Sequence, residues 1–341
     1  MRWLEQNWYR VSAPHLALWP LSLAFGAAAA ARRALYRAGA LATERLPVPV
    51  IVVGNITVGG TGKTPLVCWL ARFLRERGHV PGIVSRGYRG SACMPRAARG
   101  DSDPAVVGDE AVLLARRTDC PVWVGARRAA AARALLAAHA DCSVIVGDDG
   151  LQHYALARDA EIAVVDGERG FGNGMLLPAG PLREPPQRLE QVDAVVTNGA
   201  ALFPHEELPC SVPLFEMRLT GSVFYNLLNP ELHVGPEHFL QRRVHAVAGI
   251  GNPHHFFARL RELGVSFTAH PFPDHHAFSA AELAAFTPPA ADGGDVIMTE
   301  KDAVKCERFC NENCWALRID AEVEPGLGER VLRQLENRSS S

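Results

Sequence analysis

The sequence predicts an α/β protein whose first domain is a parallel sheet with helices on both faces, followed by a second, smaller α/β domain. Short runs of apolar, β-branched residues recur along the chain, and such runs are typical of buried parallel strands. Segments with helical spacing, at residues 65–77 and 126–139, lie between them. The first half of the chain has six such runs, at residues 48–55, 80–85, 121–124, 143–147, 162–166 and 192–197.

The second half of the chain predicts the linker and the smaller domain. Residues 199–240 contain many prolines and little helical period, with one short strand candidate at 223–228. Strand candidates then resume at residues 244–250, 265–270, 296–299 and 316–319. We therefore divide the chain into an N-terminal apolar segment (1–40), a core domain (41–212), a linker (213–240) and a smaller domain (241–336).

Composition excludes several classes of protein. The chain has 341 residues, of which 48% are hydrophobic and 21% are charged, so it can bury a core and is not disordered. With 35 basic and 37 acidic residues it has no overall basic field, and we expect no nucleic-acid partner. Eight cysteines are too few for a disulfide scaffold, which indicates reduced thiols in a cytosolic chain.

The N-terminal segment is unusually apolar. Residues 13–31 carry no formal charge, and Arg32, Arg33 and Arg37 follow them. Nineteen helical residues reach about 28 Å, close to the hydrocarbon thickness of a bilayer, but two prolines weaken the case for a spanning helix. Three interpretations remain open: a cleaved signal peptide, a buried helix of the first domain, or a helix on or shallowly inserted in a membrane surface, with the arginines meeting anionic head groups.

A glycine-rich loop lies between the first predicted strand and the first predicted helix. In such a loop, backbone N–H groups surround phosphate oxygens, Lys63 reaches the terminal phosphates and Thr64 can hold Mg²⁺. The strict pattern has glycine where this chain has Thr57. The strand–loop–helix context still predicts nucleotide binding and a P-loop NTPase-like core. The predicted phosphate-binding residues are Thr57, Val58, Gly59, Gly60, Thr61, Gly62, Lys63 and Thr64.

Carboxylates follow a later strand. The apolar run that ends at residue 147 is followed by Asp148 and Asp149, and a carboxylate at the end of such a strand holds Mg²⁺ in P-loop sites. Gln152 lies one turn further on and can reach the same cluster. We expect ATP and Mg²⁺ as cofactors.

Two further residues are candidates for acid–base chemistry. Asp109 opens an apolar helical run, where it is either a helix N-cap or the base that accepts a proton from an attacking hydroxyl. His275 lies beside Asp274 and His276 in a proline-bracketed loop of the smaller domain. Adjacent histidines in a loop are often surface residues or incidental metal ligands, but an imidazole here can also orient a carboxylate across a domain cleft.

Three cysteines form a separate pattern. Cys306, Cys310 and Cys314 are spaced four residues apart and would share one face of a helix. Pairs spaced in this way make poor tetrahedral zinc sites without a second element, so we interpret them as buried or half-buried thiols.

Taken together, these motifs resemble those of the tetraacyldisaccharide 4′-kinase family, the lipid A 4′-kinases of Gram-negative bacteria. The matching segments run in family order over nearly the whole chain: VGNITVGGTGKTP (53–65), SRGYRG (85–90), GDEA (108–111), DDGLQH (148–153), LLPAGPLREP (176–185), GIGNP (249–253), FPDHHAF (272–278) and TEKDAVKC (299–306).

The resemblance implies a reaction and a place for it. It implies transfer of the γ-phosphate of ATP to the 4′-hydroxyl of a tetraacylated glucosamine disaccharide 1-phosphate, giving lipid IVA. It also implies a P-loop core, a short two-stranded linker and a smaller C-terminal domain. The lipid substrate implies the cytoplasmic face of the inner membrane, bound peripherally or monotopically through the N-terminal helix, and we expect a monomer.

The resemblance also implies roles for particular residues. Asp109 would be the catalytic base with His275 as its partner, beside Lys63 in the catalytic set. Thr64, Asp148 and Asp149 would hold Mg²⁺, with Gln152 joining that site. Candidates for binding the phosphates of lipid or ATP are Arg86, Arg89 and Arg183, because the guanidinium fork matches phosphate oxygens. The alternative function is a P-loop regulatory or metal-handling NTPase, with the three cysteines, His275 and His276 as metal ligands.

Overall fold

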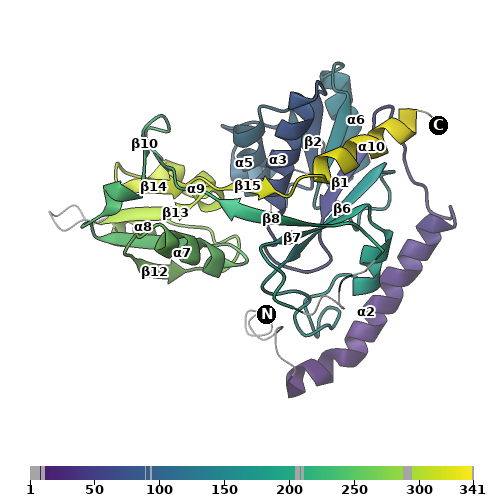
Figure 1. Cartoon of the computed structure of the whole chain (residues 1–341), viewed down its shortest axis with the longest axis horizontal. Helices are drawn as coiled ribbons and strands as arrows, with labels where there is room; N and C mark the ends of the chain where they lie inside the picture. Colours follow the sequence, from purple (N-terminus) through teal and green to yellow (C-terminus); the bar gives the residue numbers. More distant parts are fainter. Residues whose placement is uncertain are drawn as a thin grey trace.

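The computed structural model describes residues 8, 12–88, 90–92, 94–203, 208, 211–286 and 294–339. Within them the strands form two sheets joined side by side, with one long helix lying across the larger part (Figure 1). The larger sheet has nine strands in the order β15-β8-β7-β6-β1-β5-β2-β4-β3. They are β1 (Val50–Gly54), β2 (Pro81–Ser85), β3 (Arg96–Ala98), β4 (Val122–Val124), β5 (Val144–Asp148), β6 (Ala160–Asp166), β7 (Ala194–Asn198), β8 (Leu214–Thr220) and β15 (Asp320–Val323).

The six apolar runs of the first half form the parallel centre of this sheet, which confirms the predicted fold class. Every residue of β1, β2, β5, β6 and β7 is buried, because helices or loops cover both faces. Only the outer pairs β3–β4 and β8–β15 are antiparallel.

Helices pack on both faces of the larger sheet. One apolar cluster joins the sheet to α3, α5 and α10, and a second joins its other face to α6 and the 3₁₀ helix η1. The helices of this part are α3 (Lys63–Glu76), α4 (Pro104–Val107), α5 (Asp109–Thr118), α6 (Arg128–Ala138), η1 (Pro186–Gln191) and α10 (Leu327–Ser339).

The smaller sheet has six strands in the order β10-β9-β14-β13-β11-β12. Phenylalanines of α7 cover one face, and α8 and α9 cover the other. Its strands are β9 (Phe224–Asn226), β10 (His233–Val234), β11 (Val244–Ala248), β12 (Thr268–Pro271), β13 (Asp295–Thr299) and β14 (Cys314–Leu317). Its helices are η3 (Pro236–Phe239), α7 (Pro253–Glu262), α8 (Ala280–Phe286), α9 (Glu300–Cys306) and η4 (Glu307–Phe309).

Sheet membership differs from the predicted boundaries at residues 213–240 and 320–336. The predicted linker contributes β8 to the larger sheet and β9 and β10 to the smaller one. The chain then returns to the larger sheet through β15, which pairs antiparallel with β8, and ends in α10 on the core. The connection between the two sheets is therefore two-stranded (Figure 1).

The N-terminal helix α2 (Ala13–Arg37) lies mostly outside the cores. Its most apolar 18-residue window is only 11% buried, so it is not a buried helix of the first domain. It is the one helix of the described chain long and apolar enough to cross a membrane, by length and composition. Contact with the core is local: Ser22 Oγ donates to Leu176 O at 2.8 Å and accepts from Ala179 N at 3.0 Å.

The arginines at the end of α2 face the core in this structure. Arg32 donates to Gln152 O, and Arg37 donates to Gln191 Oε1 at 2.8 Å. Arg33 lies 3.9 Å from Glu184. The expected contact of these arginines with lipid head groups thus competes with polar contacts inside the protein.

The three cysteines are buried or half-buried free thiols, as predicted, but they do not share a helical face. Cys306 ends α9, Cys310 follows η4 and Cys314 begins β14, so the chain turns twice between them. Burial raises the pKa of the Cys306 thiol above its ordinary value. Across the described residues, no group of three or more His, Cys, Asp or Glu side chains is placed to hold a metal ion.

Candidate active site

The glycine-rich loop joins β1 to α3, and Lys63 is the first residue of that helix. Gly59 and Gly62 adopt φ angles of 108° and 89°, the left-handed region that favours glycine. Thr57 is not in that region and pairs with Leu182 in an isolated antiparallel bridge, which explains why threonine is tolerated where the strict pattern has glycine. The loop therefore keeps its conformation despite the departure.

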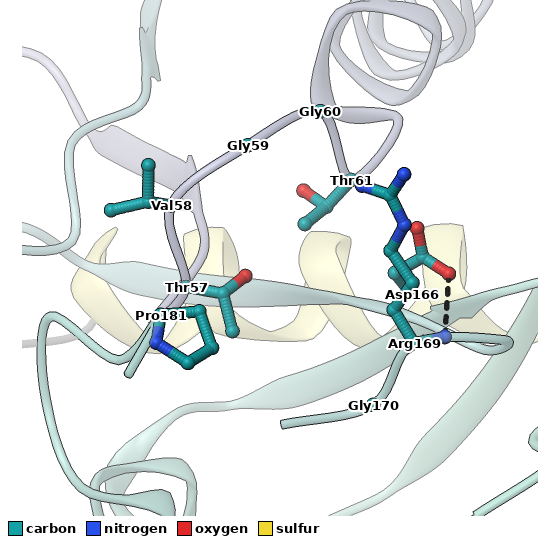
Figure 2. A pocket seen from close by; sticks show the side chains of 9 residues that line it. All are labelled: Thr57, Val58, Gly59, Gly60, Thr61, Asp166, Arg169, Gly170 and Pro181. Atoms are coloured by element: carbon teal, nitrogen blue, oxygen red, sulfur yellow. Dashed lines mark hydrogen bonds between the residues drawn. The ribbon is translucent and has the colours of Figure 1, made fainter. Parts of the chain in front are cut away.

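A small pocket opens beside this loop (Figure 2). Asp166 is the last residue of β6 and accepts hydrogen bonds from the backbone N–H groups of Glu168 and Arg169, both at 3.0 Å. The pocket is lined by Thr57, Val58, Gly59, Gly60, Thr61, Asp166, Arg169, Gly170 and Pro181.

Lys63 is held by the residues around it. Its ammonium donates to Asn55 Oδ1 at 3.2 Å and lies 3.5 Å from an oxygen of Asp149. This places the cation between the loop and the carboxyl end of β5, where terminal phosphates bind in P-loop proteins.

The two acidic residues at the end of β5, Asp148 in the strand and Asp149 after it, differ in environment. Asp148 is buried and accepts from Ser85 Oγ at 3.1 Å. Burial raises the pKa of Asp148 well above its ordinary value, and the neighbouring carboxylates of Glu110 and Asp149 raise it further. Burial acts the same way on Asp149, but there Lys63 and Arg183 outweigh it and hold the pKa below its ordinary value.

A polar network continues from Asp149. Arg183 donates to both carboxylate oxygens of Asp149 at 3.1 Å and to Gln152 Oε1 at 3.4 Å. Gln152 in turn donates to Asn55 O at 3.0 Å and to Glu184 at 2.9 Å. The network therefore joins the predicted Gln152 and Arg183 to the P-loop.

Among the described residues, Thr64, Arg86 and His276 make no hydrogen bond to this network. Thr64 is half-buried at the second position of α3, and Arg86 is exposed beyond the end of β2. Arg89 lies outside the described residues. His276 stacks on Phe272 and contacts Glu282 at 3.0 Å, away from Asp109.

Asp109 and His275 meet across the two sheets. Asp109 is the first residue of α5, after Gly108 at φ 90°, and its Oδ2 lies 3.0 Å from His275 Nδ1. His275 itself has φ 57°, and its backbone N–H donates to Gly249 O at 3.0 Å. The two side chains are 166 positions apart in the sequence, and they are in contact because the two parts of the chain pack together here.

Asp109 is 5% exposed, yet it is held as a carboxylate. Burial alone would raise the pKa of Asp109, but the hydrogen bond with His275 and the charge of Lys301 outweigh it, so the pKa lies below its ordinary value. The positive end of α5 favours the same charge state.

Sequence reasoning missed Lys301 and Glu110, which contact each other beside the Asp109–His275 pair. Lys301, in α9, contacts His275 Nε2 at 3.2 Å and Glu110 at 3.0 Å. Both lie within segments that carried the resemblance (residues 108–111 and 299–306), but no spacing rule connects a lysine at 301 with a histidine at 275. Only the packing of α9 against the loop after β12 reveals the contact.

The smaller domain also touches the P-loop. A Cβ on Gly251 would lie 2.3 Å from Gly60 N, so this close approach requires glycine. Asn252 donates to Asp166 Oδ2 at 3.2 Å, and Arg169 donates to Gly251 O at 2.8 Å. The nucleotide loop and the loop at residues 249–253 therefore form one surface.

A P-loop on a parallel sheet, carboxylates at the end of a neighbouring strand and an acid–imidazole pair that joins the two sheets define a phosphate-transferring P-loop enzyme. The chain matches the family model for tetraacyldisaccharide-1-P 4′-kinase (LpxK) over residues 14–336. It is 48% identical to the tetraacyldisaccharide 4′-kinase of Methylobacillus flagellatus, over 98% of this chain and 96% of that protein. It is 51% identical to that of Azoarcus sp., over 97% and 95%.

A solved structure agrees. The crystal structure of the "apo" form of LpxK from Aquifex aeolicus in complex with ATP is 29% identical, with a TM-score of 0.77 over 94% of this chain and 99% of that one. The chain belongs to the tetraacyldisaccharide 4′-kinase family, and its activity is that of a kinase in lipid A biosynthesis. The regulatory or metal-handling alternative is set aside.

Proposed function

We propose that this kinase moves the γ-phosphate of ATP to the 4′-hydroxyl of tetraacyldisaccharide 1-phosphate, with Asp109 as the base. The contact between Asp109 and His275 carries this proposal, because it joins a buried carboxylate of the core to an imidazole of the smaller domain at 3.0 Å. Such a pair suits a carboxylate that must hold its orientation while an acceptor hydroxyl approaches.

The P-loop and Lys63 bind the triphosphate in this proposal. Lys63 lies 3.5 Å from Asp149, so its charge is already directed toward the carboxyl end of β5. The loop's backbone N–H groups and the start of α3 contribute further positive potential. These groups neutralise the charge on the transferred phosphoryl oxygens.

The oxygen donors at the end of β5 and the start of α3 fit a magnesium ion. Asp148 is a buried carboxyl group whose pKa is raised by burial and by neighbouring acids. A divalent cation bound there would offset the unfavourable negative charge. Mg²⁺ is commonly held by one or two carboxylates and substrate phosphates, and Asp148, Asp149 and the Thr64 hydroxyl supply such donors. When bound, the ion would neutralise phosphate charge.

The proton and phosphoryl balance is simple. The 4′-oxygen forms a bond to the γ-phosphorus, the bond to the bridging β-oxygen breaks, and the hydroxyl proton passes to Asp109. The low pKa of Asp109 makes it a weak base, which is sufficient when the proton leaves late, after the new bond has acidified the hydroxyl.

Transfer of labelled γ-phosphate to the disaccharide acceptor in mixed micelles tests this function. We expect label on the 4′-position, dependence on Mg²⁺ and no transfer to water at a comparable rate. Label at another hydroxyl, or release as free phosphate alone, would contradict the proposal.

Asp148→Asn is expected to stabilise the ligand-free protein above pH 7 while lowering transfer. Because the pKa of Asp148 is raised by burial, the unfolded chain ionises this residue more easily than the folded one, and stability falls as pH rises above the ordinary carboxyl pKa. Asparagine does not ionise, so the variant avoids this loss of stability, but its neutral amide oxygen is a weaker ligand for a cation than a carboxylate. Melting curves at pH 5 and pH 8, with transfer assays, check both parts; an unchanged rate would exclude Asp148 from the metal site.

We propose further that the enzyme is a monomer that lies on the cytoplasmic face of the inner membrane through α2. Large apolar side chains in its N-terminal half are exposed, with Leu16 at 56%, Trp19 at 51% and Leu23 at 54%. An acylated acceptor stays in the bilayer, so an exposed apolar helix beside the core is a suitable anchor.

Replacing both Trp19 and Leu23 with lysine is expected to weaken binding to phospholipid vesicles at least tenfold. Burial of one large apolar side chain contributes about 1.5–3 kcal/mol, and this variant loses two. The control is Leu232→Lys with Leu240→Lys, which charges exposed leucines of the smaller domain. Vesicle co-sedimentation measures both variants, and equal loss in the two would contradict an anchor on α2.

A further inference from the structure

The ammonium of Lys301 contacts three groups around the acid–imidazole pair. Its Nζ lies 3.2 Å from His275 Nε2, 3.0 Å from Glu110 Oε1 and 3.5 Å from Asp274 Oδ1. The Lys301 side chain is 17% exposed, so these contacts form in a largely dry environment. They connect three elements: α9, α5 and the loop after β12.

The chemistry of these groups fixes the protons on the histidine ring. A lysine ammonium has three donors and no acceptor, so the His275 nitrogen that faces it at hydrogen-bond distance must present a lone pair. Nε2 is then unprotonated, and the ring proton is on Nδ1. That nitrogen lies 3.0 Å from Asp109 Oδ2, where its N–H donates to the carboxylate.

We propose that Lys301 is a positioning residue, which holds His275 in the tautomer that donates to Asp109 and thereby orients the base. The inference rests on the proposed role of Asp109 and extends it from a pair to a chain of three side chains. Asp109 Oδ1 accepts from the backbone N–H of Glu110 at 2.9 Å, so both carboxylate oxygens have fixed partners. A base fixed in this way keeps its reactive lone pair aimed at an incoming hydroxyl.

The charges around the ring are consistent with this role. Facing His275 are the carboxylates of Asp109 from α5 and Asp274 from its own loop, the ammonium of Lys301 from α9, and the ring of Tyr88 at 5.0 Å. Without Lys301, the two carboxylates would favour a proton on Nε2 or a turned ring. The ammonium opposes both, because a proton on Nε2 would face a cation.

Lys301→Met is the first test. Methionine keeps the length of the side chain but has no donor, and we expect kcat to fall about 10–100-fold, with the KM for ATP changed less than about twofold. Lys301→Arg keeps a cation and its donors and is expected to recover part of the lost kcat. A Met variant with wild-type kcat would overturn the proposal, and so would an Arg variant no better than Met.

Lys305→Met is the matched control. Lys305 lies one turn further along α9, is similarly buried at 13% side-chain exposure, and pairs with Asp302 at 2.7 Å instead of with His275. Melting temperatures of both variants separate loss of fold from loss of positioning. If Lys305→Met lowers kcat as much as Lys301→Met at equal stability, the effect belongs to the helix and the proposal is wrong.

Nitrogen NMR of the unmodified enzyme is the second test and does not depend on the Lys301 variants. The ring nitrogen shifts of His275, assigned as the signals missing from His275→Gln, distinguish a protonated Nδ1 from a protonated Nε2. We expect a protonated Nδ1 and a bare Nε2, and the reverse pattern would overturn the proposal. The hypotheses about Asp109 and Lys301 can fail separately. Normal transfer by Asp109→Ala would contradict the role of Asp109 as the base, whereas the wrong tautomer of His275 would contradict only the role of Lys301.

Discussion

Asp109→Ala is expected to lower kcat for transfer by about 10²–10⁴-fold, the range typical of removing a general base. Asp109 begins α5 and is not part of the loop and α3 start that we propose bind the triphosphate, so ATP affinity should change little. The carboxylate, at the first position of α5 and 3.0 Å from His275, is the group we place beside the acceptor hydroxyl. Single-turnover transfer and an ATP titration measure the two quantities separately.

A nearby carboxylate provides the control. Asp103 caps α4 by accepting from Ala105 N at 2.9 Å and lies on the same connection before α5. Asp103→Ala should cost a little stability through the lost cap but leave kcat within a few-fold. The base assignment would fail if Asp109→Ala kept normal turnover, or if both variants lost activity equally.

The centre of the fold could be predicted from the sequence because its strands are buried on both faces. Val50–Gly54 is apolar throughout, and Ala160–Asp166 has a continuous apolar centre at residues 162–165; such runs are a strong signal of parallel strands. A strand buried on both faces accepts mostly apolar residues, so its apolar run can be recognised in the sequence without knowing how the strand packs.

The strands that join the two sheets could not be predicted in the same way. Leu214–Thr220 has only one buried residue, Met217, because it connects the domains instead of lying inside one. Its partner, Asp320–Val323, is a short strand that begins with an acid and pairs with residues about 100 positions earlier. A pattern in the local sequence carries no information about such a long-range pairing.

The candidate site was only partly visible in the sequence. The loop ending at Lys63 and the acids Asp148 and Asp149 follow local rules for phosphate and metal binding. The pairing of Asp109 with His275 came from the family resemblance, and the contact of Lys301 with His275 came from neither, because it depends on how α9 packs. Contacts between domains thus require the structure.

Arg117→Met is expected to destabilise the protein by about 3–5 kcal/mol, the usual cost of removing one partner of a buried ion pair. Arg117 lies in α5 and contacts Glu300 at the start of α9 and Asp320 in β15, both at 2.5 Å. The Glu300 side chain is 8% exposed, and burial already raises its pKa despite the guanidinium. Without Arg117 this carboxylate must be protonated or rehydrated in the folded protein.

The position of Arg117 gives this loss a functional consequence. It ties α5, which begins at Asp109, to α9, which carries Lys301, so weakening the tie should also lower kcat at temperatures where the protein remains folded. Urea unfolding measures stability, with Arg77→Met as control, because Arg77 and Glu329 form an exposed pair worth at most about 1 kcal/mol. Equal losses in the two variants would contradict the prediction. Adding Glu300→Gln to Arg117→Met should restore part of the stability, because the uncompensated charge is then gone.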